Sequence, residues 1–70
     1  MQTNARLNKV KGYRNMLGLT QDEFAEAVNI AARTYYNKEK GISQFSVEEL
    51  IRIKDYLKSK EIEVTLEELI

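Results

Sequence analysis

The chain has 70 residues, with 11 basic and 11 acidic side chains and no cysteine, histidine or proline. That length suits a single domain near the lower size limit for independent folding, so we expect one domain over residues 1–70. The missing cysteines exclude disulfides and thiolate metal sites, and without histidine zinc would have only carboxylates to bind. We therefore expect no metal or other cofactor. The absence of proline and the short β-branched runs favour an all-α fold.

The composition also argues against a membrane protein and against an enzyme. The longest apolar runs are only a few residues, too short for a signal peptide or a membrane span. We expect a soluble, cytoplasmic protein with no membrane partner. A chain without histidine, cysteine, a metal cluster or a phosphate-binding glycine loop offers little basis for an enzyme or a small-molecule substrate site.

Zero net charge counts against a nucleic-acid ligand, but the charge is segregated along the chain. Residues 1–20 contain four basic side chains and no acid, whereas residues 61–70 contain four acids and no base. Phosphates respond to local potential over a Debye length of about 8–10 Å, so such a chain can still present a positive face. A solvated mosaic of charges without a binding role fits the pattern equally well.

The first predicted helix covers residues 5–17, with Thr3 or Asn4 as its cap. Four of its residues fall on one side, namely Leu7, Val10, Arg14 and Leu17. Gly12 lies in the middle and costs about 1 kcal/mol relative to alanine. It marks either a close approach of another backbone or a tolerated residue. Gly18 suits the left-handed position that ends a helix.

Residues 21–41 predict two short helices joined by a tight turn. Thr20 and Glu23 have the spacing of a capping box, and Leu19 before them suits a hydrophobic staple. The first helix buries Phe24, Ala25 and Val28, and Asn29 ends it because asparagine tolerates positive φ. Ile30 returns to the core. The second helix covers residues 31–40 and points Tyr35 inward. Two short helices with this turn and these buried residues are the pattern of a helix-turn-helix.

Gly41 ends the predicted helix over residues 31–40. Two further helices are predicted after it. Residues 42–45 form a loop, and Ser46 with Glu49 makes a second capping box. The helix over residues 47–59 has an apolar stripe of Val47, Leu50, Ile53 and Leu57. Thr65 with Glu68 makes a third box before a final turn that contains Leu66, Leu69 and Ile70. The prediction is therefore five helices.

At this point the sequence resembles the Cro and phage-repressor type of helix-turn-helix domain, also called the XRE family. The resemblance is carried by Arg14, Gly18-Leu19-Thr20-Gln21, Phe24-Ala25, Thr34-Tyr35, Glu39-Lys40-Gly41, Ser46 to Leu50, Ile53, Leu57 and Val64 to Leu69. It implies a compact five-helix bundle of the lambda-repressor-like kind. The implied function is a sequence-specific DNA-binding transcriptional regulator, of phage or mobile-element repressor type. Its third helix would enter the major groove of a double-stranded operator.

The resemblance also implies roles for individual residues. The base-contacting residues would be Ala32, Arg33, Thr34 and Asn37. Arg33 would bind guanine and Asn37 adenine, each pair contributing roughly 1–3 kcal/mol of discrimination. The phosphate-contacting residues would be Gln21, Tyr36, Lys40, Ser43 and Gln44. Thr34 and Tyr36 could each touch base methyls or phosphates. Plain solvent exposure is the alternative for Arg33, Tyr36 and Lys40.

Arg14 and Glu39 are implied to form a structural ion pair, partly buried, that holds the third helix. Losing one partner of a buried pair should cost about 3 kcal/mol or more.

Five residues depart from the family pattern. Asn29 stands where glycine is usual, and Lys54 occupies a position that is usually small. Lys38 stands where an apolar side chain usually packs, so it must snorkel or change the tilt of the helix. Ala31 offers no side-chain cap, and Ala32 offers only a methyl group for base reading.

A homodimer through the last two helices is implied as well. Apolar residues near them exceed what one small core hides, namely Ile51, Leu66, Leu69 and Ile70. A symmetric interface would cover them, and so would packing within the chain. The alternative function is a protein-interaction module on the same scaffold, such as an antitoxin or adaptor, which the neutral charge and Ala31 and Ala32 favour. Salt-dependent DNA affinity distinguishes the two functions.

Overall fold

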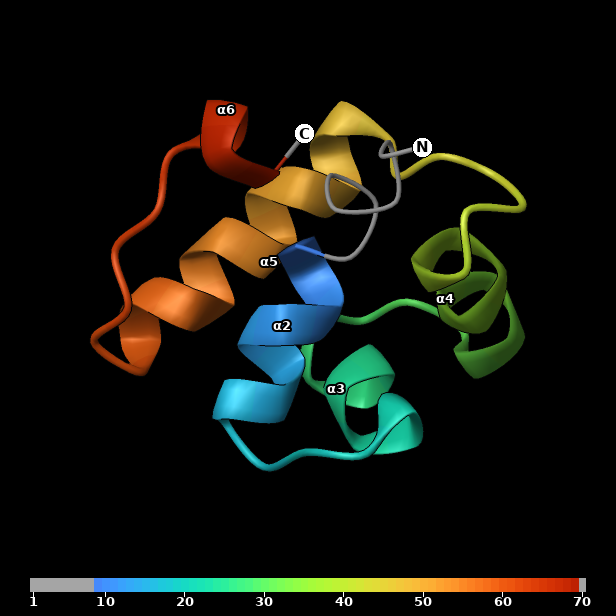
Figure 1. The fold of residues 1–70 in the computed structure, drawn as a ribbon, viewed down its shortest axis with the longest axis horizontal. Coiled ribbons are helices and arrows are strands. Elements are labelled where there is room, and N and C mark those ends of the chain that lie inside the picture. Colours follow the sequence, from blue (N-terminus) through green and yellow to red (C-terminus); the bar gives the residue numbers. More distant parts are fainter. Residues whose placement is uncertain (1–8, 70) are drawn as a thin grey trace.

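The computed structural model describes residues 9–69, which fold into five helices without a strand in that range (Figure 1). The helices are α2 (Lys9–Met16), α3 (Gln21–Ala27), α4 (Ala32–Glu39), α5 (Val47–Ser59) and α6 (Leu66–Leu69). The all-α class is confirmed, and the helix boundaries agree with the predicted ones to within two residues wherever both can be compared. The predicted helix start over residues 3–8, with Leu7, and the terminal Ile70 lie outside the described residues.

The helices enclose one hydrophobic core. α3 packs on α4, and the short α6 packs on both α2 and α5, the longest helix (Figure 1). The buried hydrophobic residues are Val10, Phe24, Ala25, Val28, Ile30, Tyr35, Leu50, Ile53, Leu57, Val64 and Leu69. Every helix contributes at least one of them, so the position of each helix depends on the same core.

Local sequence determines where three of the helices begin. Before α3, the Thr20 hydroxyl accepts from the Glu23 amide at 3.1 Å, and the Glu23 carboxylate accepts from the Thr20 amide at 2.9 Å. The same reciprocal pair of bonds joins Ser46 and Glu49 before α5, and Thr65 and Glu68 before α6. Each box satisfies two backbone donors that the helix itself leaves unpaired, which confirms all three predicted boxes.

Left-handed residues make the corners between helices. Gly18 has φ 72°, Asn29 φ 60° and Gly41 φ 87°, and each is the second residue after a helix, so the predicted helix-ending residues are left-handed. Glu61 has φ 65°, which was not predicted. The corner at Asn29 is also held from a distance, because Arg52 in α5 donates to the Asn29 carbonyl at 2.9 Å. The helix-turn-helix angle therefore rests on both local conformation and a contact with α5.

The predicted apolar stripe of α5 is wrong at one end. Leu50, Ile53 and Leu57 are buried, but Val47 is 66% exposed. Val47 is the first residue of the helix, directly after its cap, and α5 reaches the core only at Leu50. Periodicity identifies the side of a helix that faces the core, but it does not show where along the axis the core begins.

Gly12 provides a test of the tolerance interpretation. A Cβ atom built on Gly12 would meet nothing within 4 Å, so no neighbouring backbone requires glycine at this exposed position in α2. We expect Gly12→Ala to raise the free energy of unfolding by about 1 kcal/mol, measured by urea denaturation, because alanine favours helix.

Gly18→Ala is the matched control. Gly18 also has open space around a Cβ, but its φ of +72° strains any side-chain-bearing residue. It should lose about 1 kcal/mol by the same measurement. A loss of stability in the Gly12 variant would show that the open space is not what decides this position.

Candidate nucleic-acid interface

A buried carboxylate joins the first three described helices. Glu39, the last residue of α4, is only 3% exposed. Arg14 of α2 donates from Nε to Oε2 at 2.8 Å and from Nη2 to Oε1 at 3.3 Å. Tyr35 of α4 donates its hydroxyl to Oε2 at 2.6 Å, and Gln21 of α3 donates its amide to Oε1 at 2.7 Å. We call these four residues the Glu39 network.

The Arg14 guanidinium also has hydrogen-bond acceptors for its nitrogens. Arg14 is 9% exposed, and its Nη1 donates to the Leu19 carbonyl at 2.8 Å, in the segment that links α2 to α3. Within residues 9–69, every buried side-chain nitrogen and oxygen has a hydrogen-bond partner. Full satisfaction is what makes a buried ion pair tolerable, because desolvation otherwise exceeds the Coulombic gain.

Ionisation in the network follows from these contacts. Burial works to raise the pKa of Glu39, but hydrogen bonds from Arg14, Tyr35 and Gln21 outweigh it and hold the pKa below its usual value. The hydrogen bond to Glu39 raises the pKa of Arg14, although burial opposes this. Burial and the bond to Glu39 raise the pKa of the Tyr35 phenol. The network is thus a carboxylate held by one cation and two neutral donors.

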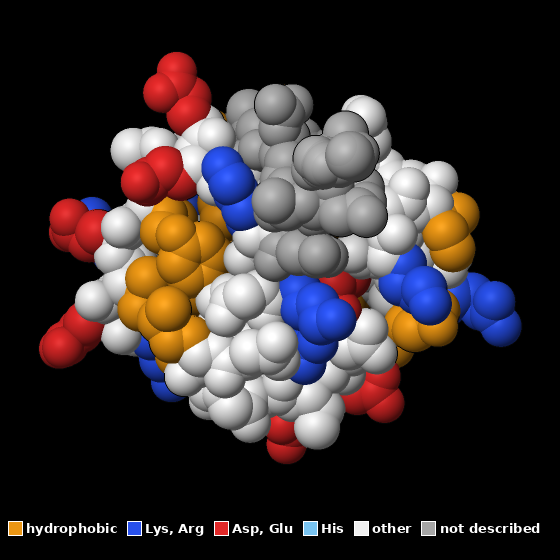
Figure 2. Space-filling model, viewed as in Figure 1, with side chains coloured by type: hydrophobic (Ala, Val, Ile, Leu, Met, Phe, Trp, Pro, Cys, Tyr) orange, Lys and Arg blue, Asp and Glu red, His pale blue; other side chains and the backbone are white. Residues whose placement is uncertain are grey.

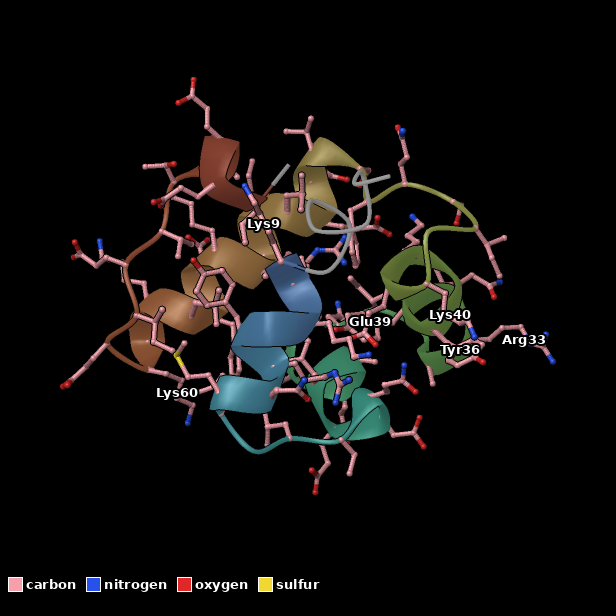
Figure 3. All side chains as sticks on the ribbon, viewed as in Figure 1. Lys9, Arg33, Tyr36, Glu39, Lys40 and Lys60 are labelled. Atoms are coloured by element: carbon pink, nitrogen blue, oxygen red, sulfur yellow. The ribbon has the colours of Figure 1, made fainter. Side chains whose placement is uncertain are left out.

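Tyr35 and Glu39 lie one turn apart and fix which side of α4 faces inward. Both are buried, whereas Ala32, Arg33, Thr34 and Tyr36 are exposed and Asn37 is half-buried. Figure 3 shows Glu39 directed toward α2 and α3, with Arg33, Tyr36 and Lys40 on the outer side of α4. The expected base-contacting residues therefore share an accessible face, with Asn37 at its edge.

The expected phosphate-contacting residues fall into two groups. Tyr36, Lys40, Ser43 and Gln44 are exposed, on α4 or in the loop after it. The Lys40 ammonium lies 5.2 Å from the centroid of the Tyr36 ring, within cation–π range. Gln21 differs, because it is half-buried and one of its amide protons is used by Glu39. Its second amide proton remains for an anion.

Lys38 forms a second ion pair that sequence reasoning missed. Its ammonium donates to Glu49 Oε1 at 2.6 Å, and the same oxygen accepts from the Ser46 amide at 2.8 Å. Both side chains are largely buried, at 16% and 14% exposure. Burial works to raise the pKa of Glu49, but the bonds from Lys38 and Ser46 lower it overall. The lysine at an apolar position therefore reaches the cap of α5.

Charged side chains of both signs cover the folded chain, but their balance differs between its two ends. On the right of Figure 2, over α4, basic side chains lie beside hydrophobic ones. Acidic side chains gather at the opposite end, over α6 and the segment before it, where Glu61, Glu63, Glu67 and Glu68 are exposed. An anionic ligand would therefore meet a more favourable potential at α4 than at α6.

The described part of the chain has neither a membrane-spanning helix nor a metal-binding cluster. From residue 9 to residue 69, no helix has the length and apolarity needed to cross a bilayer. The same residues contain no group of three or more histidine, cysteine, aspartate or glutamate side chains arranged to hold a metal ion.

Comparison with known families adds one finding. A family model described as helix-turn-helix matches residues 10–69, which includes α3 to α6 entirely and nearly all of α2. This is the Cro and phage-repressor type, and the family consists of DNA-binding regulatory domains. Neither a curated protein nor a solved structure matches the chain.

Removing the Glu39 carboxylate should destabilise the fold. We expect Glu39→Ala to lower the free energy of unfolding by about 3–5 kcal/mol at neutral pH, because Arg14 is left buried without its partner. Urea denaturation measures the change. Glu48→Ala, at an exposed acidic position in the first turn of α5, is the control and should change by less than about 0.5 kcal/mol. Superimposable curves for Glu39→Ala and the parent would remove the ion pair from the account.

The network also predicts a pH dependence. The Glu39 pKa is lower in the folded chain than its usual value of 4.5, so its stabilising contribution is complete above that value and is lost as the pH falls through the folded pKa. We expect the free energy of unfolding to fall below about pH 4.5 and to fall less steeply in Glu39→Gln. Urea denaturation from pH 2 to 7 tests this. Equal slopes in the two proteins would contradict it.

Proposed function

Because the chain belongs to the helix-turn-helix family of the Cro and phage-repressor type, we propose that it is a sequence-specific transcriptional regulator. It inserts α4 in the major groove of an operator and acts by occupying that site. One observation supports the proposal most. The Glu39 network, which includes Tyr35, holds the inner side of α4. This leaves Arg33 and its neighbours facing solvent.

Base contacts follow from the exposed face of α4. Arg33 presents two parallel N–H donors to guanine O6 and N7, and Asn37, one turn further on, suits the N6 and N7 edge of adenine. Ala32 and Thr34 have only small side chains, so α4 can approach the base edges closely. Each bidentate pair contributes roughly 1–3 kcal/mol of discrimination against the wrong base at its position.

Phosphate contacts frame the recognition helix on two sides. Lys40, Ser43 and Gln44 extend from the end of α4 into the following loop, and all three are exposed. The Tyr36 hydroxyl can donate to a phosphate oxygen of the DNA strand that these three residues follow. Gln21 lies at the start of α3, where Glu39 holds its amide in one orientation and leaves one proton for a phosphate oxygen. These contacts set the register of α4 without reading sequence.

A homodimer is part of the proposal, with α5 rather than α6 supplying the described apolar surface. Leu69 is buried within the chain and Leu66 is half-buried, so their surface is mostly used. Val47 and Ile51 remain exposed, at 66% and 41%, and lie one turn apart on α5. A two-fold contact over them would place two α4 helices on an operator with inverted half-sites.

Fluorescence anisotropy with a random-sequence duplex tests whether DNA is the ligand. A protein that neutralises several phosphates should lose affinity steeply between 50 and 200 mM salt. The absence of binding near 50 mM salt would instead favour a protein partner on the same scaffold. Selection of bound duplexes from a random pool then identifies the operator, and inverted half-sites in it would support the dimer.

Arg33→Lys separates sequence reading from charge. Lysine retains the positive charge but cannot make the rigid bidentate contact that arginine makes with guanine. We expect the preference for the selected duplex over a random one to fall about 10- to 100-fold, with random-duplex affinity and its salt slope unchanged. Melting temperature should also stay unchanged, because Arg33 is exposed. Equal discrimination by variant and parent would exclude Arg33 as a base-contacting residue.

A further inference from the structure

The outer face of α4 contains an apolar row beside its polar one. Arg33 and Asn37 are four residues apart and form the polar row, while Ala32 and Tyr36, also four apart, form the apolar row. Ala32 is exposed, and Tyr36 is 43% exposed. The second row adds exposed hydrocarbon surface to a face whose other expected contacts are polar.

Tyr36 differs from every other aromatic residue in the chain. Two aromatic rings lie in the core, Phe24 and Tyr35, and the three others pack against it, namely Tyr13, Phe45 and Tyr56. Tyr36 instead extends from the outer side of α4 next to Arg33 and Lys40 (Figure 3). Its ring therefore contributes apolar surface where folding does not require it.

Lys40 holds that ring before any ligand arrives. The ammonium lies 5.2 Å from the ring centroid, one helical turn after Tyr36. A cation over an exposed ring restricts its rotamers, so less side-chain freedom is lost on binding. Ala32, one turn before Tyr36 on α4, is exposed as well.

The major groove offers a limited set of partners for such a surface. Among the edges of the four base pairs, the apolar group there is the C5 methyl of thymine. Arg33 precedes Tyr36 by three residues, which puts their Cβ atoms about 5–6 Å apart. Successive base pairs are separated by about 3.4 Å along the axis, so the two side chains can reach neighbouring pairs.

We propose that Tyr36, held by Lys40 and flanked by Ala32, is a specificity-determining residue that reads the C5 methyl of a thymine next to the guanine bound by Arg33. The inference rests on the proposed function. It names two neighbouring bases, a guanine and a thymine, that α4 selects in its operator. This thymine contact adds to the phosphate contact proposed for the Tyr36 hydroxyl, and the two can be tested apart. The methyl contact needs the ring alone, whereas the phosphate contact needs the hydroxyl.

Deoxyuridine provides the probe. A duplex selected from a random pool is resynthesised with each thymidine next to a guanine replaced in turn by deoxyuridine, which removes only the methyl and keeps every pairing and groove hydrogen bond. We expect one replacement to weaken binding by the parent about fourfold, the effect of one buried methyl group. Tyr36→Phe should keep this difference, and Tyr36→Ala should bind both duplexes equally. Melting curves verify that both variants are folded.

The outcomes separate the two levels of the proposal. If no sequence is enriched from the pool, the proposed function fails and the inference fails with it. If a sequence is enriched but lacks thymine next to guanine, or binds equally well with deoxyuridine, the inference alone is overturned. A uridine effect that persists in Tyr36→Ala would overturn the assignment to this ring. Equal weakening on both duplexes in Tyr36→Phe, with no thymine preference left, would identify the hydroxyl as the contact.

Discussion

The structure depends on one buried negative charge. Glu39 accepts two hydrogen bonds from Arg14 and one each from Tyr35 and Gln21, so its carboxylate ties α4 to α2 and α3 at a single point. A carboxylate that is 3% exposed is stable only with such partners, and the partners in turn lose their compensation if α4 rotates. The rotational setting of α4, and with it the side that Arg33 presents, follows from this requirement.

A second ion pair acts on the other neighbour of the same helix. Lys38 reaches the carboxylate that also caps α5, so the start of α5 and the end of α4 are held together. Arg52 adds a bond from α5 to the corner at Asn29, which precedes α4. The helix is therefore fixed at both ends and on two sides before it meets a ligand. Preorganisation of this kind reduces the conformational entropy lost on binding, which benefits a small domain with a modest interface.

Much of this fold could be predicted from sequence because its determinants are local. A capping box needs two residues three apart, and glycine and asparagine favour a left-handed corner, so Thr20, Ser46, Thr65 and Asn29 were readable directly. The corner at Glu61 was not, because glutamate has no such preference. The exposure of Val47 and the partners of Lys38 and Gln21 were not, because they depend on where helices cross in space. Gln21 and Glu39 are 18 residues apart, and no spacing rule relates them. The ion pair of Arg14 and Glu39 was expected only through the family resemblance.

The central claim is that α4 reads base edges in the major groove. Methylation interference on a duplex selected from a random pool tests it most directly, because dimethyl sulfate modifies guanine N7 in the major groove and adenine N3 in the minor groove. If α4 reads base edges as proposed, methylation of at least one guanine N7 should block binding, because Arg33 would use that acceptor. Interference confined to adenine N3, or none at either base, would contradict it.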